Sequence, residues 1–202
     1  MDLFKLFIAG GPVMGLMLLG SLATAAIMID RFLFYRHADK GMNRFIEKLP
    51  SLMEKASWQE MHVAVSQEEN AAAYAAGEGI RAMMEGKDAE LSLEVAYQTV
   101  AALLRARLNY LSMLVTLSPL LGLLGTIGGM ISSFQIFNLQ DGAPLAITGG
   151  IGEALIATAT GLCVAIFALV VHTYFAQRFD DILTAVERAE ALVTAEVRKR
   201  GC

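Results

Sequence analysis

LNYLSMLVTLSPLLGLLGTIGGMISSFQIFNLQ, residues 108–140, contains no charged side chain and directly follows Arg107. A helix needs about 20 apolar residues to cross the hydrocarbon core of a bilayer, and this run is longer. The rest of the chain agrees, because its 202 residues are 55% hydrophobic and their mean hydropathy is +0.52. These values are too apolar for an ordinary soluble domain. The stretch therefore predicts a membrane-spanning helix.

A second uncharged run covers residues 6–29, between Lys5 and Asp30. It could be read as a signal peptide, since one Lys precedes it and residues 23–25 (Ala-Thr-Ala) resemble a cleavage site. The apolar region of a signal peptide usually spans about 7 to 15 residues, and this run is longer. We therefore interpret it as a transmembrane helix.

A third run extends from Gly142 to Gln177 and contains a single carboxylate, Glu153. We assign its membrane-spanning part to residues 150–177. Together the runs predict an all-α membrane protein with three transmembrane helices.

The positive charges predict the orientation of these helices. Ten Lys or Arg residues lie in residues 30–107 and five in residues 178–202, whereas residues 141–149 contain none. Loops rich in Lys and Arg stay in the cytoplasm. We therefore expect a cytoplasmic loop and a cytoplasmic tail, with the turn and the N-terminal residues 1–5 on the periplasmic side.

The polar segments have the pattern of long helical extensions. Apolar residues recur at helical spacing in the tail, and no proline follows Pro144, so we expect the third span to continue into the tail as one helix. Residues 88–107 predict a helix that runs into the second span. Residues 39–86 are helical in pattern but are expected to be interrupted at Pro50, Gly77 and Gly86.

Several classes of function have no support in the sequence. The net charge is -4 and no basic cluster is interleaved with aromatic residues, so nucleic acid is not an expected partner. Cys163 and Cys202 indicate neither a disulfide framework nor a metal site. No HExxH, GxSxG or P-loop pattern occurs, so we predict neither an enzyme nor a cofactor.

Small residues recur every three or four positions in the second and third spans. Membrane helices associate by close packing, which small side chains permit. We expect a tight helical hairpin, and in a sharper reading also a subunit interface. A bend is expected at Pro119, which lacks a backbone donor. The predicted packing residues are Gly122, Gly125, Gly129, Ala154, Ala157 and Gly161.

The polar residues within the spans are the candidates for a functional site. A carboxylate in a membrane is costly, so Glu153 marks either a site or a residue wetted at the helix N-terminus. Thr126, Thr158 and Thr160 could order water in a passage, or could bond a carbonyl of their own helix. Thr160 lies along the helix axis from Glu153, and Thr158 lies about 140° away. His172 fits an interfacial residue better than a proton relay.

What the spans lack is also informative, because no acid lies in the middle of the membrane. Beyond Glu153 there is no Asp, Glu, Lys, Arg or His in the third span until His172. The chain therefore cannot relay protons across the whole membrane alone. We expect a second protein to supply a central carboxylate.

Two segments carry a family resemblance. Residues 118–130, SPLLGLLGTIGGM, are similar to the second-span signature of the MotA/TolQ/ExbB proton-channel family. Residues 150–162, GIGEALIATATGL, resemble its third-span signature. Three predicted spans resemble the ExbB and TolQ branch more than MotA, which has four.

The resemblance implies an architecture and a function in the bacterial inner membrane. Five subunits would form a ring around two single-span partners of the ExbD or TolR type, each with a transmembrane aspartate. The resemblance places Thr126 and Thr158 beside that aspartate and Glu153 near the pore, and so selects Thr158 over the Thr160 that helical phase favours. The partner would transmit mechanical work to a TonB- or TolA-type protein. The alternatives are a Tol-Pal, flagellar or gliding stator, or a non-conducting membrane scaffold.

Overall fold

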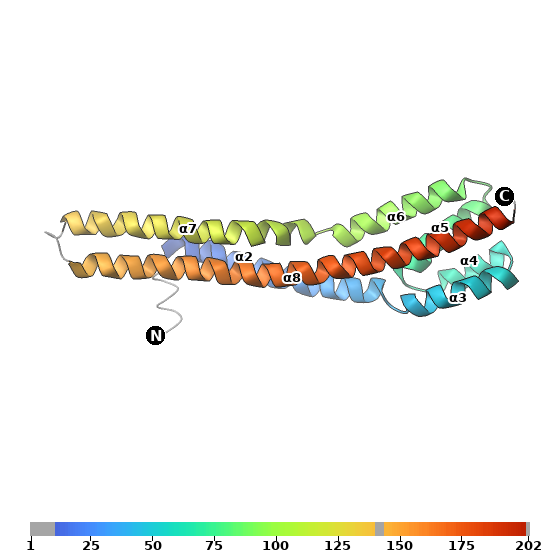
Figure 1. Cartoon of the computed structure of the whole chain (residues 1–202), viewed down its shortest axis with the longest axis horizontal. Helices are drawn as coiled ribbons and strands as arrows, with labels where there is room; N and C mark the ends of the chain where they lie inside the picture. Colours follow the sequence, from blue (N-terminus) through green and yellow to red (C-terminus); the bar gives the residue numbers. More distant parts are fainter. Residues whose placement is uncertain (1–10, 140–143, 201–202) are drawn as a thin grey trace. The chain divides into compact units, whose positions relative to one another are not determined.

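The structure of the chain is a computed structural model, and it describes residues 11–139 and 144–200 (Figure 1). All regular secondary structure in these residues is helical. The predicted N-terminal residues 1–5 and the first residues of the first span lie outside the described residues. The helices are α2 (Gly11–Ala38), α3 (Met42–Lys55), α4 (Trp58–Ser66), α5 (Ala71–Met84), α6 (Ala89–Arg105), α7 (Leu108–Leu139) and α8 (Pro144–Lys199).

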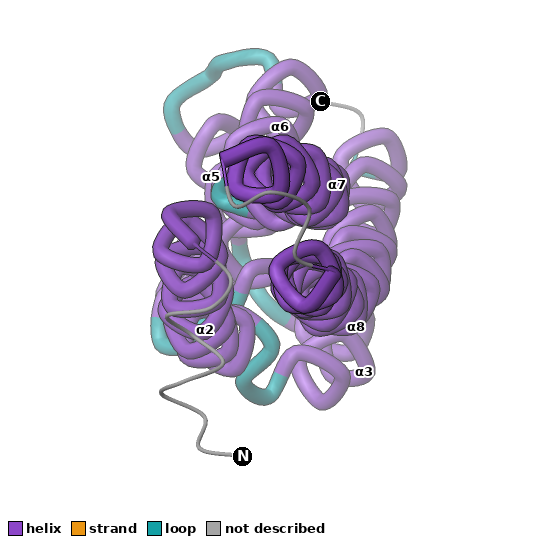
Figure 2. The backbone as a smooth tube through the Cα atoms, turned by 90° about the vertical axis from the view of Figure 1, so that its left-hand side faces the viewer, coloured by secondary structure: helices purple, strands orange, loops and turns teal. Residues whose placement is uncertain are grey.

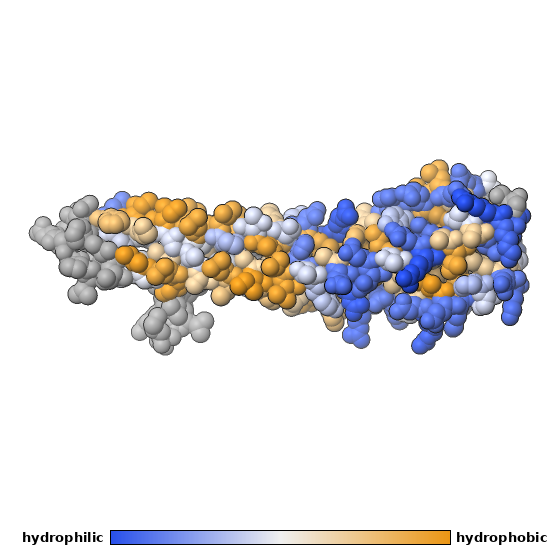
Figure 3. Space-filling model, viewed as in Figure 1, coloured by the Kyte–Doolittle hydropathy of each residue, from blue (hydrophilic) through white to orange (hydrophobic). Residues whose placement is uncertain are grey.

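The chain divides into two compact units, each formed by segments distant in sequence. One unit, here called the apolar unit, comprises residues 1–29 and 107–174, and the polar unit comprises residues 30–106 and 175–202. Figure 3 shows hydrophobic side chains over the helices of the first unit and hydrophilic side chains over the second.

Three helical stretches of the described residues are long and apolar enough to cross a membrane. Their most apolar windows have mean hydropathies of 2.0, 1.8 and 2.5 and contain the apolar parts of α2, α7 and α8. In Figure 2 these helices are seen end on, grouped around a common centre. The prediction of an all-α chain with three candidate spans is confirmed.

The bounds of α7 and α8 agree with most of the predicted hairpin. Helix α7 covers the predicted second span except its last residue, and α8 continues without interruption to Lys199, as expected for the third span and tail. The predicted turn at 141–149 is too long, because α8 begins at Pro144. Proline suits the first turn of a helix, where its missing N–H would have had no helical partner. Residues 140–143 lie outside the described residues.

Within the apolar unit, α2 packs on the hairpin through buried side chains. Met14 and Met17 form a cluster with Val164 of α8, and Leu121 of α7 packs against it. A β-carbon on Gly20 would lie 3.5 Å from a methyl group of Leu114, an ordinary contact distance. Most large side chains on the other faces of these helices are exposed, as lipid-facing or subunit-facing positions would be.

In the polar unit, helix ends are set by capping residues. Ser57 and Glu60 form a reciprocal capping box at the start of α4, and Asn70 and Asp88 cap α5 and α6. The helices begin at these capping residues, and two of the predicted interruptions are wrong. Pro50 lies inside α3 and Gly77 inside α5, whereas the predicted break at Gly86 is confirmed by its positive φ of 66°.

The predicted helix over residues 88–107 does not continue into the second span. Helix α6 ends at Arg105 and α7 begins at Leu108. Arg107 between them has a φ of 70°, a left-handed conformation that is uncommon for a residue with a β-carbon. No glycine or proline marks this break, so the helical pattern of the sequence concealed it.

Two side chains of α2 in the polar unit stabilise the end of α6. Arg31 donates from its Nη1 to the carbonyl oxygens of Leu103 and Ala106, at 3.1 Å each. The Tyr35 hydroxyl donates to the Leu104 carbonyl at 2.8 Å. The last carbonyls of a helix lack partners in the helix itself. Arg31 is only 5% exposed and Tyr35 only 4%, so these bonds close the end of α6 inside the unit.

Candidate functional site

The helices α7 and α8 meet along a seam of small residues, here called the small-residue seam. A β-carbon placed on Gly161 would lie 2.6 Å from the carbonyl oxygen of Ser118, and one on Gly122 would lie 3.1 Å from the Cα of Thr158. The neighbours in both cases are backbone atoms, which cannot rotate away. The two backbones therefore approach as closely as glycine permits.

The same contact continues along the antiparallel pair. A β-carbon on Gly125 would lie 2.7 Å from that of Ala157, and one on Gly129 would lie 3.0 Å from that of Ala154. The structure thus places all six predicted packing residues on the seam within one chain. That these six residues also form a contact between subunits remains a prediction.

Thr158 is the polar side chain that bridges the seam. Its hydroxyl donates to the carbonyl oxygen of Gly122 on α7 at 3.0 Å. This bond joins two helices, whereas an intramembrane threonine commonly bonds the carbonyl one turn back in its own helix. The hydroxyl group can reach α7 because glycine at position 122 leaves the backbone of that helix uncovered.

The other candidate threonines bond their own helices. Thr126 donates to the Leu123 carbonyl at 2.6 Å and Thr160 to the Ile156 carbonyl at 2.8 Å. Thr126 lies one turn beyond Gly122 on α7, and it is close in sequence to the carbonyl that Thr158 binds. Thr160 directly precedes Gly161 of the seam, but its hydroxyl bonds a carbonyl of its own helix.

Glu153 lies on a different face of α8 from Thr158. It is exposed, whereas the adjacent Ala154 is 3% exposed and packs in the seam. Glu153 and Thr158 are about 140° apart around the axis of α8, so the two side chains flank the seam on opposite sides. Among the described residues no group of His, Cys, Asp or Glu could hold a metal ion.

Pro119 lies inside α7, which is unbroken from Leu108 to Leu139. The bend expected there stays a prediction. The preceding Ser118 is 3% exposed and donates its hydroxyl to the Leu114 carbonyl at 2.7 Å. Its own carbonyl faces Gly161, so this turn of α7 forms one end of the small-residue seam.

One participant in the site had no signal in the sequence. The Gly122 carbonyl accepts the Thr158 hydroxyl, but every residue has a carbonyl and no residue type marks one as an acceptor. The glycine itself was predicted as a packing residue. Its second role follows only from the register of the two helices.

Comparison with known proteins gives a consistent result. Residues 54–188 match the family described as the MotA/TolQ/ExbB proton channel family. The chain is 34% identical over 173 residues to the "Putative biopolymer transport protein ExbB-like 3" of Synechocystis sp., which covers 82% of this chain and 81% of that protein.

Two other relatives match over shorter segments. The "Putative biopolymer transport protein ExbB-like 1" of Synechocystis sp. is 44% identical over 85 residues, 40% of this chain and 34% of the relative. The "Tol-Pal system protein TolQ" of Pseudomonas aeruginosa is 35% identical over 103 residues, 50% of this chain and 44% of the relative. The chain therefore spans less than half the length of these two proteins.

Proposed function

The chain belongs to the MotA/TolQ/ExbB proton channel family, and we propose that it is the channel subunit of a proton-driven stator in the bacterial inner membrane. The relatives named ExbB and TolQ support a role in energising the cell envelope rather than in enzymatic catalysis. The observation that carries the proposal is the Thr158 hydroxyl bond to the Gly122 carbonyl, which lies where the two family signatures meet.

The proton-carrying acid comes from a partner in this proposal. Glu153 is the only carboxylate in the described part of the apolar unit, and it is not on the seam. Five copies of the chain would surround two single-span ExbD- or TolR-type helices, each of which brings an aspartate into the membrane. Thr126 and Thr158 would lie beside that aspartate.

The threonine hydroxyl suits this role because it donates and accepts hydrogen bonds. If the Thr158 hydroxyl donates its hydrogen bond to the partner aspartate instead, the Gly122 carbonyl can accept a hydrogen bond from water or from the protonated acid. Loading and unloading of the aspartate would then move the partner inside the ring. Each charge that crosses 100 mV releases about 2.3 kcal/mol, so several protons would be needed for substantial work.

The proposed topology places the N-terminus in the periplasm and the tail in the cytoplasm. The moving partner would then act on a TonB- or TolA-type protein in the periplasm. The names of the relatives support both a biopolymer transport system and a Tol-Pal system. A flagellar or gliding stator is the further alternative within the same family.

A non-conducting scaffold is the alternative from another class. It is favoured by the bonds of Thr126 and Thr160 to their own helices, because hydroxyls satisfied in this way need no water or partner. In that case the small-residue seam would serve assembly alone.

Proton flux in liposomes distinguishes the two functions. The chain is reconstituted with its co-purified single-span partner, and flux is measured under an imposed membrane potential. We expect Thr158→Ala to reduce the flux at least tenfold and Thr158→Ser to preserve it, because serine retains the hydroxyl. Size-exclusion chromatography checks that each complex remains assembled.

Thr160→Ala is the matched control, since it removes the same atoms two residues away. We expect it to conduct like the unmodified protein. Equal flux in Thr158→Ala and the unmodified protein would contradict the role of Thr158. Loss in Thr160→Ala alone would transfer the role to Thr160, and absence of flux in every complex would support the scaffold.

A further inference from the structure

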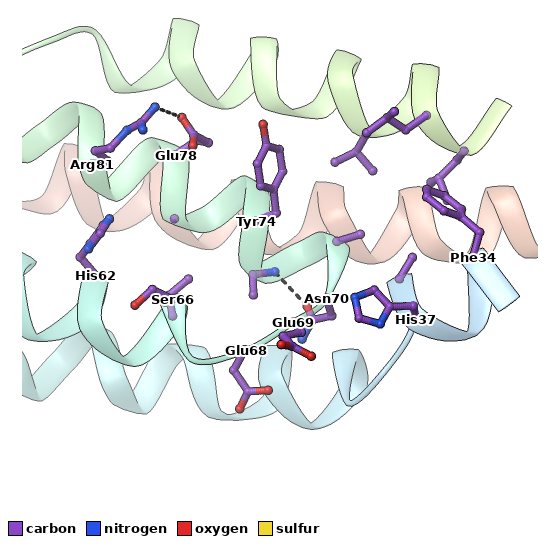
Figure 4. A pocket seen from close by; sticks show the side chains of 18 residues that line it. Phe34, His37, His62, Ser66, Glu68, Glu69, Asn70, Tyr74, Glu78 and Arg81 are labelled. Carbon is purple, nitrogen blue, oxygen red and sulfur yellow. Dashed lines mark hydrogen bonds and ion pairs between the residues drawn. The ribbon is translucent and has the colours of Figure 1, made fainter. Parts of the chain in front are cut away.

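A groove in the polar unit is separate from the small-residue seam. It has a volume of about 510 Å³ and lies between the last turn of α2, α4, α5 and α6 (Figure 4). Val65, Val100 and Leu104 are nearly fully buried and form part of its apolar lining. A cavity of this size, with an apolar lining and a few polar groups, is typical of a binding site.

Asn70 supplies a polar group that the fold does not satisfy. Its Oδ1 accepts the backbone N–H of Ala73 at 2.9 Å and so caps α5. Its Nδ2 is buried and has no hydrogen-bond partner among the described residues, although the residue lines the groove and is only 5% exposed. Since less than 1 Å² of this atom is exposed, it lies beneath the surface of the groove, out of reach of a docked ligand.

The charges around the groove favour a positive ligand. Three carboxylates line it, on Glu68, Glu69 and Glu78. Arg81 is the only Lys or Arg in the lining and forms an ion pair with Glu78. Figure 4 shows this pair and, in another part of the groove, Glu69 beside Asn70.

Lys40, outside the lining, approaches Glu69 at 3.6 Å, but both side chains are about two-thirds exposed and such pairs are weak. The acidic side of the groove would repel a phosphate or another anion. It would attract Lys or Arg.

The rim of the groove offers apolar contacts to a ligand. Tyr74 is 47% exposed and Leu103 53% exposed, and both line the groove. An exposed tyrosine beside an apolar cavity is a common anchor in protein interfaces, because its ring contributes large contact area. Figure 4 shows Tyr74 on α5 projecting toward α6.

We propose that this groove binds a short basic peptide segment of another protein. An apolar side chain of the segment fills the cavity between Tyr74 and Leu103. A Lys or Arg of the segment pairs with Glu68 or Glu69. This peptide site is independent of the proposed proton channel, because none of its residues lies in the apolar unit.

Fluorescence anisotropy tests the peptide site with two labelled probes. One probe is a nonapeptide of alternating Leu and Lys, and the other is its counterpart of alternating Leu and Glu. The full chain is purified in a non-ionic detergent micelle. We expect the basic probe to bind at least tenfold more tightly than the acidic one.

Two sets of variants assign the binding to the groove. Tyr74→Ala removes the exposed aromatic anchor at the rim, and we expect about tenfold weaker binding with unchanged helicity. The double variant Glu68→Gln, Glu69→Gln should weaken binding by a similar factor. Its control, Glu47→Gln with Glu54→Gln, removes the same charge from exposed positions of α3 and should bind normally.

Three results would overturn the proposal. The first is equal loss of affinity in the groove and control variants, which would indicate attraction to overall charge. The second is no binding of the basic probe at 1 mM, a concentration at the weak limit of specific recognition. The third is a photo-crosslinker at Tyr74 that captures only a second copy of this chain, which would make the groove a contact between subunits.

Discussion

The seam between α7 and α8 is built of glycine and alanine, whereas the polar unit buries large side chains such as Leu49, Met61 and Ile182. In water, burial of apolar surface drives such packing. In lipid, two helices gain little from covering apolar surface and associate through close van der Waals contact. The seam therefore depends mainly on small side chains, whereas the polar unit combines the buried alanines of α5 with large apolar side chains.

Hydrogen bonding differs between the units in a similar way. The polar unit uses side chains to close helix ends, as Ser57 does for α4 and Arg31 and Tyr35 do for α6. In the seam, among the described residues, a hydrogen bond from Thr158 to a carbonyl in the middle of α7 joins the two helices. Loss of a side-chain hydrogen bond should therefore open a helix end in the polar unit, but loosen the contact between two helices in the seam.

The largest expected effect is that of Gly161→Ala. The added methyl would meet the backbone of Ser118 and Gly122, so α7 and α8 must separate. We expect a loss of about 3 kcal/mol, the upper range for overpacking. Thermal unfolding of the purified chain in detergent, followed by circular dichroism, measures it.

Gly152→Ala is the matched control on the same helix. Its β-carbon would meet nothing within 4 Å among the described residues. Alanine is also the better helix former, by about 0.5 to 1 kcal/mol. Similar destabilisation by both substitutions would contradict the idea that close approach holds the seam.

The next effect concerns the end of α6. Arg31→Met keeps an apolar stem but leaves the carbonyls of Leu103 and Ala106 without this donor, and we expect a loss of about 2 to 3 kcal/mol. Arg36→Met removes the same charge from an exposed position and should change stability by less than about 0.5 kcal/mol. Chemical unfolding of the two variants in parallel gives the difference.

Tyr35→Phe separates the contribution of Tyr35 at the end of α6 from that of Arg31. It removes only the bond to the Leu104 carbonyl, so we expect a loss of about 1 kcal/mol. Burial, opposed by Arg31, raises the pKa of Tyr35 to about 12, so the hydroxyl remains a donor at physiological pH. In this variant the backbone amides at the end of α6 should exchange their hydrogens faster than in the unmodified protein. An unchanged exchange rate there would show that Arg31 alone closes the helix.

The sequence was sufficient for the features that depend on composition and repeated spacing. Uncharged length predicted the three candidate spans, and small-residue spacing indicated residues such as Gly122 and Gly161. It failed where a single backbone conformation decides the outcome. Arg107 adopts a left-handed conformation without a glycine to announce it, and Pro50 is tolerated inside α3.

The candidate sites were predictable to different degrees. Thr158 was selected by family resemblance, but its acceptor on α7 depends on how the two helices are aligned. The groove in the polar unit combines residues of four helices with Glu68, Glu69 and Asn70 of the α4–α5 connection, and their distance in the sequence conceals it. Asn70 could be predicted as a helix cap, whereas its second, unsatisfied group depends on what packs around it.

The smallest predicted effect comes from Glu190 of α8, an acid in the polar unit that lacks a full set of partners. Its Oε1 is buried without a hydrogen-bond partner among the described residues. Burial, and to a smaller extent the negative charges of the nearby Glu94 and Glu187, raises the pKa of Glu190 from 4.5 to about 7. The folded chain therefore holds a proton at this position that the unfolded chain releases near pH 4.5.

The sign of the pH dependence follows from this difference. Below pH 4.5 both states are protonated, and as the pH rises toward 7 only the unfolded state ionises, so stability falls over this window. Glu190→Gln should remove that slope and stabilise the chain above pH 7 by about 1 kcal/mol, a value reduced for solvent screening of a partly exposed group. Thermal unfolding from pH 5 to 8 measures it.

Glu196 on the same helix provides a control of opposite sign. A hydrogen bond from Arg200 lowers the pKa of Glu196, so its contribution to stability is lost as the pH falls through that lowered value. Glu196→Gln should therefore leave the slope between pH 5 and 7 intact, whereas Glu190→Gln removes it. If neither substitution changes the slope, the proton is held elsewhere in the polar unit, and the buried Oε1 of Glu190 is satisfied by water in solution.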